Sequence, residues 1–530
     1  MKIERILIED QMAPIGLDEK KPAFSWLLTA EEGEQNLMQS ACRIVVRTGE
    51  DTVWDSGKME TGVSTGIGYE GEALQPCTKY EVKAEVWDNH GGKAEAESSF
   101  ETGLMDSLYA AWEGAEWIGA PHATVCAENR GVFTIESEFR MEGGKGEAGI
   151  VFGANDFRLN DHTKNELGME GENYIRYAVC LEDGDARLEI YRVGYAPEDT
   201  AEKPFAVTKL VNWKEKTQEI LTPENADAFH KLTVEVDGNV AYAYVDGILV
   251  DAIEEHGFFG TKVSGRQLNP RGNNDVLPYP RLNEIGFYAG KGTTGYFKNL
   301  TVRNVRKPSA EIVRETPEGR LDGGKSIFAD QIPVENGYFK VEDSQITADP
   351  SHHSIPMLRS CISCQKEKKL ASARLYITAR GIYDCRINGQ EITEDLLRPG
   401  LTQYDHRMNY QTYDITGLMK PGRNGIGVTL ASGWWSEAQT FVVKNFNYFG
   451  DKESLLAKVV MKYEDGSREV FGTNTEDWKY FGEGPYLFSS YFAGEQYDAR
   501  RAEVYETYSL PEFDDSTWEK PVVVDTVMIE

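Results

Sequence analysis

The stretch from residue 373 to residue 435 constrains the fold of this chain more than any other part of the sequence. Its first segment alternates strictly, with Leu375, Ile377 and Ala379 on one face, as in a strand that buries one side. The pair Asn388-Gly389 follows and predicts a tight hairpin, because both turn positions need positive φ. Pro421-Gly422 separates later strands of the same kind. The stretch therefore predicts an antiparallel β-sandwich.

This stretch and the residues after it resemble the β-sandwich that precedes the catalytic barrel in bacterial α-L-rhamnosidases of glycoside hydrolase family 78. The matching blocks keep the order of that family: Ile387-Asn388-Gly389, Leu397-x-Pro399-Gly400, Tyr404-Asp405, Tyr410–Thr416, Gly433-Trp434-Trp435, Tyr463–Ser467 and Gly494–Arg500. Several ordered blocks make the resemblance specific, whereas no single block would. The resemblance implies that the chain is the N-terminal, non-catalytic region of such an enzyme.

The length of the chain, 530 residues, suggests about three or four domains. Hydrophobic residues make up 40% and aromatic residues 11%, which is enough for several cores. The formal net charge of -31 argues against nucleic acid, which needs a basic face to neutralise phosphates, and against anionic membrane surfaces. We therefore expect neither nucleic acid nor a membrane as a partner.

Seven scattered cysteines do not form a disulfide framework, so a reducing compartment fits best. Cys361 and Cys364 form a lone CxxC pair without the second ligand pair that zinc needs, and a core position is favoured over a metal or redox site. The N-terminus has no apolar signal region, and no apolar run is long enough to span a bilayer. The predicted location is the cytoplasm.

Residues 1–107 predict a fibronectin-III-like β-sandwich, because short alternating strands are separated by turns. Tyr80–Asp88 is one such strand, and Asn89–Gly92 turns it. Trp54 and Trp87 could stack on sugars, but we interpret them as core anchors between the sheets. The order of Phe24-Ser25-Trp26 and later blocks also resembles the N-terminal module of the same family.

Residues 115–308 predict a jelly roll of the concanavalin-like kind, because many long alternating strands follow one another. Asp237-Gly238 and Asp246-Gly247 predict two of its hairpins. The unit resembles lectin-like modules, which implies a carbohydrate-binding module that holds rhamnose with help from calcium. The predicted ligands of both sugar and calcium are Asn155 and Asp156, since adjacent amide and carboxylate oxygens suit calcium. An ordinary Asn-Asp turn is the alternative, and it is favoured over the metal site.

The jelly roll is not expected to be a hydrolase itself. Retaining enzymes of that fold place alternating carboxylates on one strand, about 5 Å apart. Here Glu136 and Glu138 share a strand face, but no third carboxylate completes the set. An exposed sheet of an acidic protein explains them.

Residues 309–505 predict the second β-sandwich, with a polar connector over 311–360. Trp434 and Trp435 are adjacent, so in a strand one fills the core while the other is exposed. We expect the exposed tryptophan to contact a neighbouring domain, and the second possibility is a contact with sugar. Trp435 is the candidate for the sugar contact. Residues 506–530 predict a linker.

The fold class is thus all-β: a fibronectin-III-like sandwich, a concanavalin-like jelly roll and a second β-sandwich. No segment has the helical period of an (α/α)6 barrel, so we predict no catalytic residues here. The resemblance implies the accessory region of an enzyme that hydrolyses terminal α-L-rhamnosides, with the catalytic domain beyond residue 530. The implied partners are a rhamnose-containing glycan or glycoside and an own or separate catalytic (α/α)6 domain. The alternatives are a free-standing carbohydrate-binding protein without hydrolase activity, and a scaffold that braces a separately encoded barrel.

Overall fold

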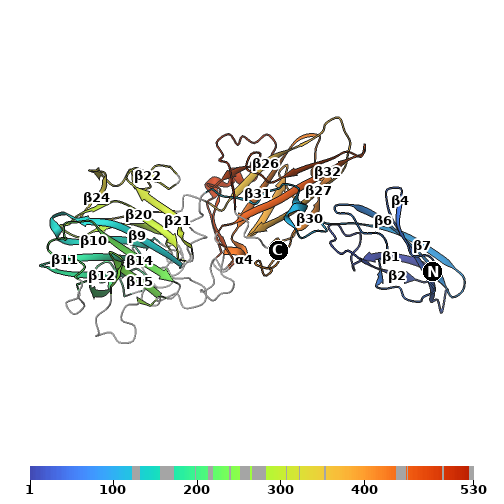
Figure 1. The fold of residues 1–530 in the computed structure, drawn as a ribbon, viewed down its shortest axis with the longest axis horizontal. Coiled ribbons are helices and arrows are strands. Elements are labelled where there is room, and N and C mark those ends of the chain that lie inside the picture. The colour runs from blue at the N-terminus through green and yellow to red at the C-terminus, as the bar shows by residue number, and fades with distance from the viewer. Residues whose placement is uncertain are drawn as a thin grey trace.

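The computed structural model of the chain describes residues 1–121, 132–155, 172–196, 198–212, 219–237, 240–250, 263–264, 282–305, 307–321, 323–350, 354–436, 449–450, 452–491 and 494–524. The regular structure of these residues is almost entirely β, which confirms the predicted all-β class. Three domains follow one another across the molecule, and the third lies between the first and the second (Figure 1). No described helix is long and apolar enough to cross a membrane.

The first domain is a sandwich of a three-stranded and a four-stranded sheet, as in a fibronectin-III-like fold. The sheets are β1 (Lys2–Ile8), β2 (Ala23–Thr29) and β5 (Ile67–Gly68), against β4 (Asp51–Asp55), β3 (Gln39–Thr48), β6 (Lys79–Asp88) and β7 (Lys93–Glu101). Trp54 packs on Phe24 in the core, as predicted. For Trp87 the core prediction is wrong. Its ring lies on the outer side of β6 under Lys58 and Lys93, because Val86 takes the inward position.

The second domain is a jelly roll of two facing sheets with one aromatic-rich core. The six-stranded sheet contains, in order, β13 (Phe205–Leu210), β12 (Asp185–Val193), β11 (Tyr174–Glu182), β10 (Gly146–Ala154), β18 (Glu284–Ala289) and β25 (Gln345–Ala348). The main path of the larger sheet is β16 (Ile248–Leu249), β15 (Val240–Val245), β14 (His230–Asp237), β9 (Val132–Met141), β19 (Thr294–Phe297), β24 (Tyr338–Glu342) and β23 (Val334–Glu335). Strands β17 (Val263–Ser264), β20 (Leu300–Asn304), β21 (Lys307–Thr316) and β22 (Gly319–Arg320) pair beside this path.

The predicted boundary between residues 308 and 309 lies too early. Strands β21 to β25 pair within the two jelly-roll sheets, and Phe328 and Phe339 belong to the jelly-roll core. The segment predicted as a connector is therefore part of the jelly roll as far as Ala348. The apolar alternation of β24 is short, since only Phe339 and Val341 of this strand face inward. Turns and polar residues surround it, so the sequence did not indicate a strand.

The third domain is a second sandwich, as predicted. One sheet contains β29 (Gln390–Glu391), β28 (Ile382–Ile387), β31 (Gly422–Ala431), β26 (Met357–Cys364) and β34 (Lys479–Phe481). The other contains β30 (Gln411–Asp414), β27 (Leu370–Arg380), β32 (Ser454–Tyr463), β8 (Ile118–Gly119) and β37 (Val522–Val523), with β33 (Arg468–Gly472) beside β32. Asn388 and Gly389 both have positive φ between β28 and β29, so the predicted hairpin is confirmed. Cys364 is buried in this core and Cys361 is half-buried, as the core interpretation requires.

Strand β8 precedes the jelly roll in the chain and yet pairs with β32 and β37 of the third domain. The jelly roll is therefore inserted between β8 and β26 of this sandwich. The start of the second domain predicted at residue 115 is wrong for this reason. Strand β8 has two residues, which is too short to show an apolar alternation in the sequence. Its sheet could therefore not be predicted.

The segment predicted as a linker, 506–530, packs on the third domain as far as it is described. It follows α5 (Ala502–Thr507), and Tyr508 is fully buried. The buried Arg359 donates from Nε to Tyr508 O at 2.7 Å and from Nη2 to Leu510 O at 3.1 Å, and it also pairs with Asp515. This part of the chain is a covering layer of the sandwich and ends in β37.

Candidate carbohydrate-binding surface

Asn155 follows β10 directly, at one end of the six-stranded sheet, and has a left-handed backbone with φ +50°. Its Nδ2 donates to Glu284 Oε2 at 2.8 Å, and the same oxygen accepts from Thr347 Oγ1 at 2.8 Å. The backbone N of Asn155 donates to Asn173 O at 3.0 Å. The fold therefore joins the predicted residue to Glu284 and Asn173, which the sequence analysis did not single out.

These residues fit a calcium ion only in part. Asn173 is fully buried, and its Oδ1 makes no hydrogen bond within the described residues. Together with Asn155 and Glu284 it offers the oxygen ligands that calcium prefers, of which the ion takes about six to eight. No three His, Cys, Asp or Glu side chains of the described residues lie together as a metal cluster. Asp156, the second predicted ligand, lies outside the described residues, so the calcium site stays a prediction.

Trp435 lies in the third domain, on the short helix α4 (Gly433–Ser436), so the strand predicted there is wrong. Gly433 starts this helix with φ +51°, and a side chain at this position would collide with Ile382. The Trp435 ring is only 7% exposed and stacks on Phe449 with ring centres 6.3 Å apart. Its contact with sugar stays a prediction. Trp435 and Asn155 belong to different domains and are not parts of one site.

The outer face of the larger jelly-roll sheet carries Glu136 and Glu138, whose carboxylates are both paired. Lys231 Nζ lies 2.7 Å from Glu136 Oε2, and Lys298 Nζ lies 2.6 Å from Glu138 Oε2. Arg303 adds a contact of 3.8 Å to Glu136. Pairing of this kind is that of a solvated sheet face.

The outer face of the six-stranded sheet is built differently, and we call it the arginine–tyrosine face. The register of its strands sets its composition. Two small residues, Gly149 on β10 and Ala178 on β11, lie opposite each other at its centre. Around them lie larger outward-facing residues of the neighbouring strands: Glu147, Tyr174, Arg176, Arg187, Glu189, Tyr191 and Tyr288.

Arg176 is the centre of the arginine–tyrosine face and is held by aromatic rings. Its guanidinium carbon lies 3.7 Å from the ring centre of Tyr288, 4.5 Å from that of Tyr191 and 5.8 Å from that of Tyr174. Such cation–π contacts are worth about 0.5–2 kcal/mol each. The guanidinium makes no hydrogen bond within the described residues, and Nε is buried.

Glu147 lies beside Arg176, but too far away for a hydrogen bond. The distance from Arg176 Nη2 to Glu147 Oε1 is 4.0 Å, and Oε1 is buried without a hydrogen-bond partner. The other oxygen, Oε2, accepts from the Tyr288 hydroxyl at 3.2 Å. Burial raises the pKa of Glu147, the nearby Arg176 opposes this effect, and Glu189 adds to it. The carboxyl group is thus desolvated without full compensation.

Glu189 shows the opposite arrangement on the same face. It accepts a hydrogen bond from the Tyr191 hydroxyl, and Arg187 Nε lies 3.4 Å from its Oε1. Because Glu189 is already paired, the groups of this face with unused hydrogen-bonding capacity are the donor Arg176 and the acceptor Glu147. Sequence reasoning missed this pair, although the alternation of β11 would have placed Arg176 on the same side as Tyr174.

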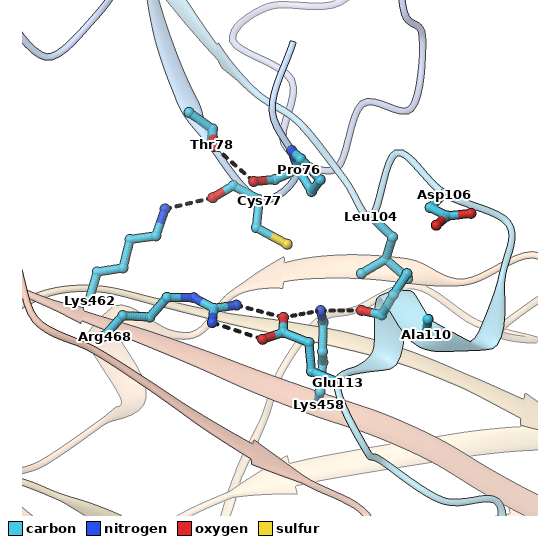
Figure 2. A pocket seen from close by; sticks show the side chains of 11 residues that line it. Pro76, Cys77, Thr78, Leu104, Asp106, Ala110, Glu113, Lys458, Lys462 and Arg468 are labelled. Atoms are coloured by element: carbon cyan, nitrogen blue, oxygen red, sulfur yellow. Dashed lines mark hydrogen bonds and ion pairs between the residues drawn. The ribbon is translucent and has the colours of Figure 1, made fainter. Parts of the chain in front are cut away.

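A cavity of about 450 Å³ lies between the first and third domains (Figure 2). Glu113 of the connecting segment binds Lys458 Nζ at 2.8 Å and both terminal nitrogens of Arg468 at 2.6 and 2.8 Å. These cations hold the pKa of Glu113 at about 2, Arg468 having the largest effect. Lys462 reaches across to the carbonyl of Cys77 in the first domain at 2.6 Å.

Two further bonds cross the same junction. Arg374 Nε donates to Glu101 Oε2 at 2.9 Å, and the Tyr410 hydroxyl donates to Asp18 Oδ2 at 2.6 Å. The Tyr410 hydroxyl also accepts from the backbone N of Leu104 at 2.7 Å. The charged groups of the cavity wall bind each other. These bonds join the first domain and the connecting segment to the third domain.

The comparisons with known proteins match the first and third domains. Residues 3–106 match the Rha78A-like N-terminal immunoglobulin domain, and residues 368–528 match the alpha-L-rhamnosidase N-terminal domain. An alpha-L-rhamnosidase of Streptomyces avermitilis is 27% identical over 523 residues, which is 96% of this chain and 44% of that protein. An alpha-L-rhamnosidase of Formosa agariphila is 37% identical over 151 residues, 28% of this chain and 16% of that protein. The chain thus spans less than half the length of these relatives.

Two solved structures share the fold. The Streptomyces avermitilis alpha-L-rhamnosidase complexed with L-rhamnose has a TM-score of 0.55 at 20% identity, covering 100% of this chain and 45% of that one. The alpha-L-rhamnosidase of Aspergillus terreus has a TM-score of 0.51 at 17% identity, covering 99% of this chain and 34% of that one. At this identity the likeness concerns the fold alone.

The first and third domains make the chain similar to the N-terminal β-sandwich region of glycoside hydrolases. The relatives that it resembles are α-L-rhamnosidases of glycoside hydrolase family 78.

Proposed function

We propose that this chain is the accessory region of an enzyme that hydrolyses terminal α-L-rhamnosides. In this proposal the jelly roll binds carbohydrate, the first and third domains brace the assembly, and a catalytic (α/α)6 domain beyond residue 530 carries out the hydrolysis. The observation that carries the proposal is the match of the first and third domains to N-terminal domains of α-L-rhamnosidases. The only helices of more than three residues named among the described residues are η1 (Tyr109–Trp112), α4 and α5, which agrees with an accessory role.

The proposed ligand of the jelly roll is a rhamnose-containing glycan or glycoside, and the proposed site is the end of β10 at Asn155. The solved Streptomyces avermitilis relative was crystallised with L-rhamnose, which supports this sugar as the first to test. Asn155, Asn173 and Glu284 would hold calcium, and a bound calcium ion would supply a positive centre for sugar hydroxyls.

Calorimetric titration of L-rhamnose, first with calcium and then with a chelator, tests the binding part of the proposal. We expect heat of binding with calcium and a weaker or absent signal with the chelator. No heat in either condition would contradict carbohydrate binding.

Incubation with a chromogenic α-L-rhamnoside tests the placement of catalysis. We expect no turnover by this chain. Clear hydrolysis would show that catalytic groups lie within the 530 residues.

The bracing role has its own support in the junction of the first and third domains. Lys458 is only 1% exposed and is bonded to both Ala111 O and Glu113, so the connecting segment is fixed to β32. The Glu113 side chain is 37% exposed, so the pair is buried on the Lys458 side alone. A first domain fixed to its neighbour in this way fits a supporting role.

A further inference from the structure

We infer that the arginine–tyrosine face is a second sugar-binding surface of the jelly roll, which takes the hydroxyl groups of a neutral saccharide between Arg176 and Glu147. The inference rests on the proposed carbohydrate-binding function, but it concerns residues other than Asn155 and requires no metal. It assigns a ligand class to a face that belongs to neither the predicted calcium loop nor the junction cavity.

The centre of the face has unused hydrogen-bonding capacity. Arg176 has hydrogen-bond donors without acceptors, and Glu147 has an acceptor, Oε1, without a donor. The two groups are 4.0 Å apart, so they do not form a hydrogen bond with each other. A buried donor or acceptor without a partner destabilises the fold, and a ligand that supplies the partner recovers this free energy.

A hydroxyl group of a ligand can satisfy the donor Arg176 and the acceptor Glu147 at once. A hydroxyl group accepts one hydrogen bond and donates another, so a single hydroxyl about 2.8 Å from each group can accept from Arg176 and donate to Glu147. A carboxylate ligand would satisfy Arg176 but meet the negative charges of Glu147 and Glu189. A cationic ligand would meet the opposite difficulty at Arg176. A neutral ligand rich in hydroxyl groups fits both.

Aromatic side chains line the face. Gly149 and Ala178 at its centre are small and are covered by the residues around them, and a Cβ at Gly149 would lie 2.0 Å from Tyr177 O. Tyr174, Tyr191 and Tyr288 surround the centre as half-buried rings. Aromatic rings with a polar tip offer sugars both an apolar surface and hydrogen-bonding groups.

The test uses the full chain and L-rhamnose in the presence of EDTA, which silences the predicted calcium site. Binding is followed by saturation-transfer NMR and by the ring resonances of the tyrosines. We expect calcium-independent binding of L-rhamnose and a shift of the Tyr288 ring signal. Arg176→Ala and Glu147→Ala should each weaken this binding at least ten-fold, because each removes a charge-assisted hydrogen bond. Arg176→Lys should recover part of it.

The matched control is Glu138→Ala, which removes a glutamate from the other outer face of the same domain. We expect its affinity for L-rhamnose to stay within about two-fold, because Glu138 is bonded to Lys298 and faces away. D-galacturonate at equal ionic strength is the control ligand. It should bind more weakly than L-rhamnose, and tighter binding would overturn the hydroxyl assignment.

The outcomes separate this inference from the proposed function. Binding that needs calcium, disappears with EDTA and is unchanged in Arg176→Ala overturns the second surface and leaves the proposed function intact. No binding of L-rhamnose in any condition contradicts both. If the alanine variants fail to fold, as seen from their unfolding midpoints, the Tyr288 ring signal of the unsubstituted chain decides. A shift on addition of L-rhamnose with EDTA supports the inference, and its absence overturns it.

Discussion

The two outer faces of the jelly roll carry the same residue types and pair them in different ways. On the larger sheet, Glu136 and Glu138 each have a lysine within 2.7 Å. On the six-stranded sheet, Glu147 faces an arginine at 4.0 Å and has a pKa raised by burial. The comparison teaches that the number of charges on a sheet says little about its role. What differs is whether each charge already has a partner.

The physical cause of the difference lies in the tyrosines. Three rings take up the guanidinium of Arg176 through their faces, so its hydrogen-bonding groups stay unused. On the larger sheet, Lys231 and Lys298 are flexible chains that reach the carboxylates directly. Substitutions on the two faces should therefore have different effects on stability.

The largest effect is expected at the centre of the arginine–tyrosine face. Gly149→Val should lower the free energy of unfolding of the jelly roll by about 2–4 kcal/mol, because its Cβ would collide with the backbone of Tyr177 and Ala178. Urea unfolding followed by tyrosine fluorescence measures this change. Thr233 lies opposite Glu136 on the outer face of the larger sheet. The substitution Thr233→Val should change stability by less than about 1 kcal/mol. Equal effects would remove the distinction between the two faces.

A smaller effect is expected from Arg176→Met, which keeps an unbranched side chain but removes the charge. We expect a loss of about 1–2 kcal/mol in unfolding free energy, because three cation–π contacts disappear while no hydrogen bond is lost. The loss should depend weakly on salt, since the contacts are largely shielded from solvent. Urea unfolding at low and high salt tests this. A strong salt dependence would show that Arg176 acts through exposed ion pairs instead.

Glu147→Gln tests the pH dependence of the same face. The groups around Glu147 are Arg176, Arg187, Glu189 and the Tyr288 hydroxyl. Because burial raises the pKa of Glu147 in the folded state, its protonated form stabilises the fold. This contribution is fully present below the unfolded pKa of about 4.3 and is lost as pH rises through the folded pKa.

The glutamine variant should therefore match the unsubstituted chain in acid and exceed its unfolding midpoint at neutral pH. Thermal unfolding from about pH 4 to pH 7 measures the difference between the two proteins. An unfolding midpoint of the variant below that of the unsubstituted chain at neutral pH would contradict a desolvated, poorly compensated carboxyl.

The smallest effect is expected from Lys298→Met on the larger sheet. The Lys298–Glu138 pair has side chains that are 37% and 38% exposed, and such pairs contribute about 0–1 kcal/mol. The small loss should vanish at high salt, where exposed charges are screened. A loss above that of Arg176→Met would reverse the comparison between the two faces.

The parts of the fold that local signals specify agree with expectation. Asn388-Gly389 turns a hairpin, and the alternation of β6 and β27 places their apolar residues inside. Long-range pairing was not predictable in this way. Strand β8 is two residues long and joins a sheet with partners more than three hundred residues away, and the strands after residue 308 join sheets that begin before residue 150. No local pattern encodes such partners.

The candidate site shows the same limit more sharply. Asn155 was predicted from its residue type, but its hydrogen-bond partner Glu284 lies 129 residues further along the chain. Glu147 and Tyr288 are 141 residues apart and meet only through the register of β10 and β18. Trp435 was expected in a strand, whereas Gly433 starts a helical turn that buries it. Residue type suggested which chemistry was available, and strand register decided where it gathers.

The insertion of the jelly roll between β8 and β26 has a consequence for its orientation. A module attached by one end turns freely about a single linker, whereas this one enters and leaves through the same neighbour and is tethered twice. Two attachment points restrict its rotation, so each face of the module keeps one direction relative to the central sandwich.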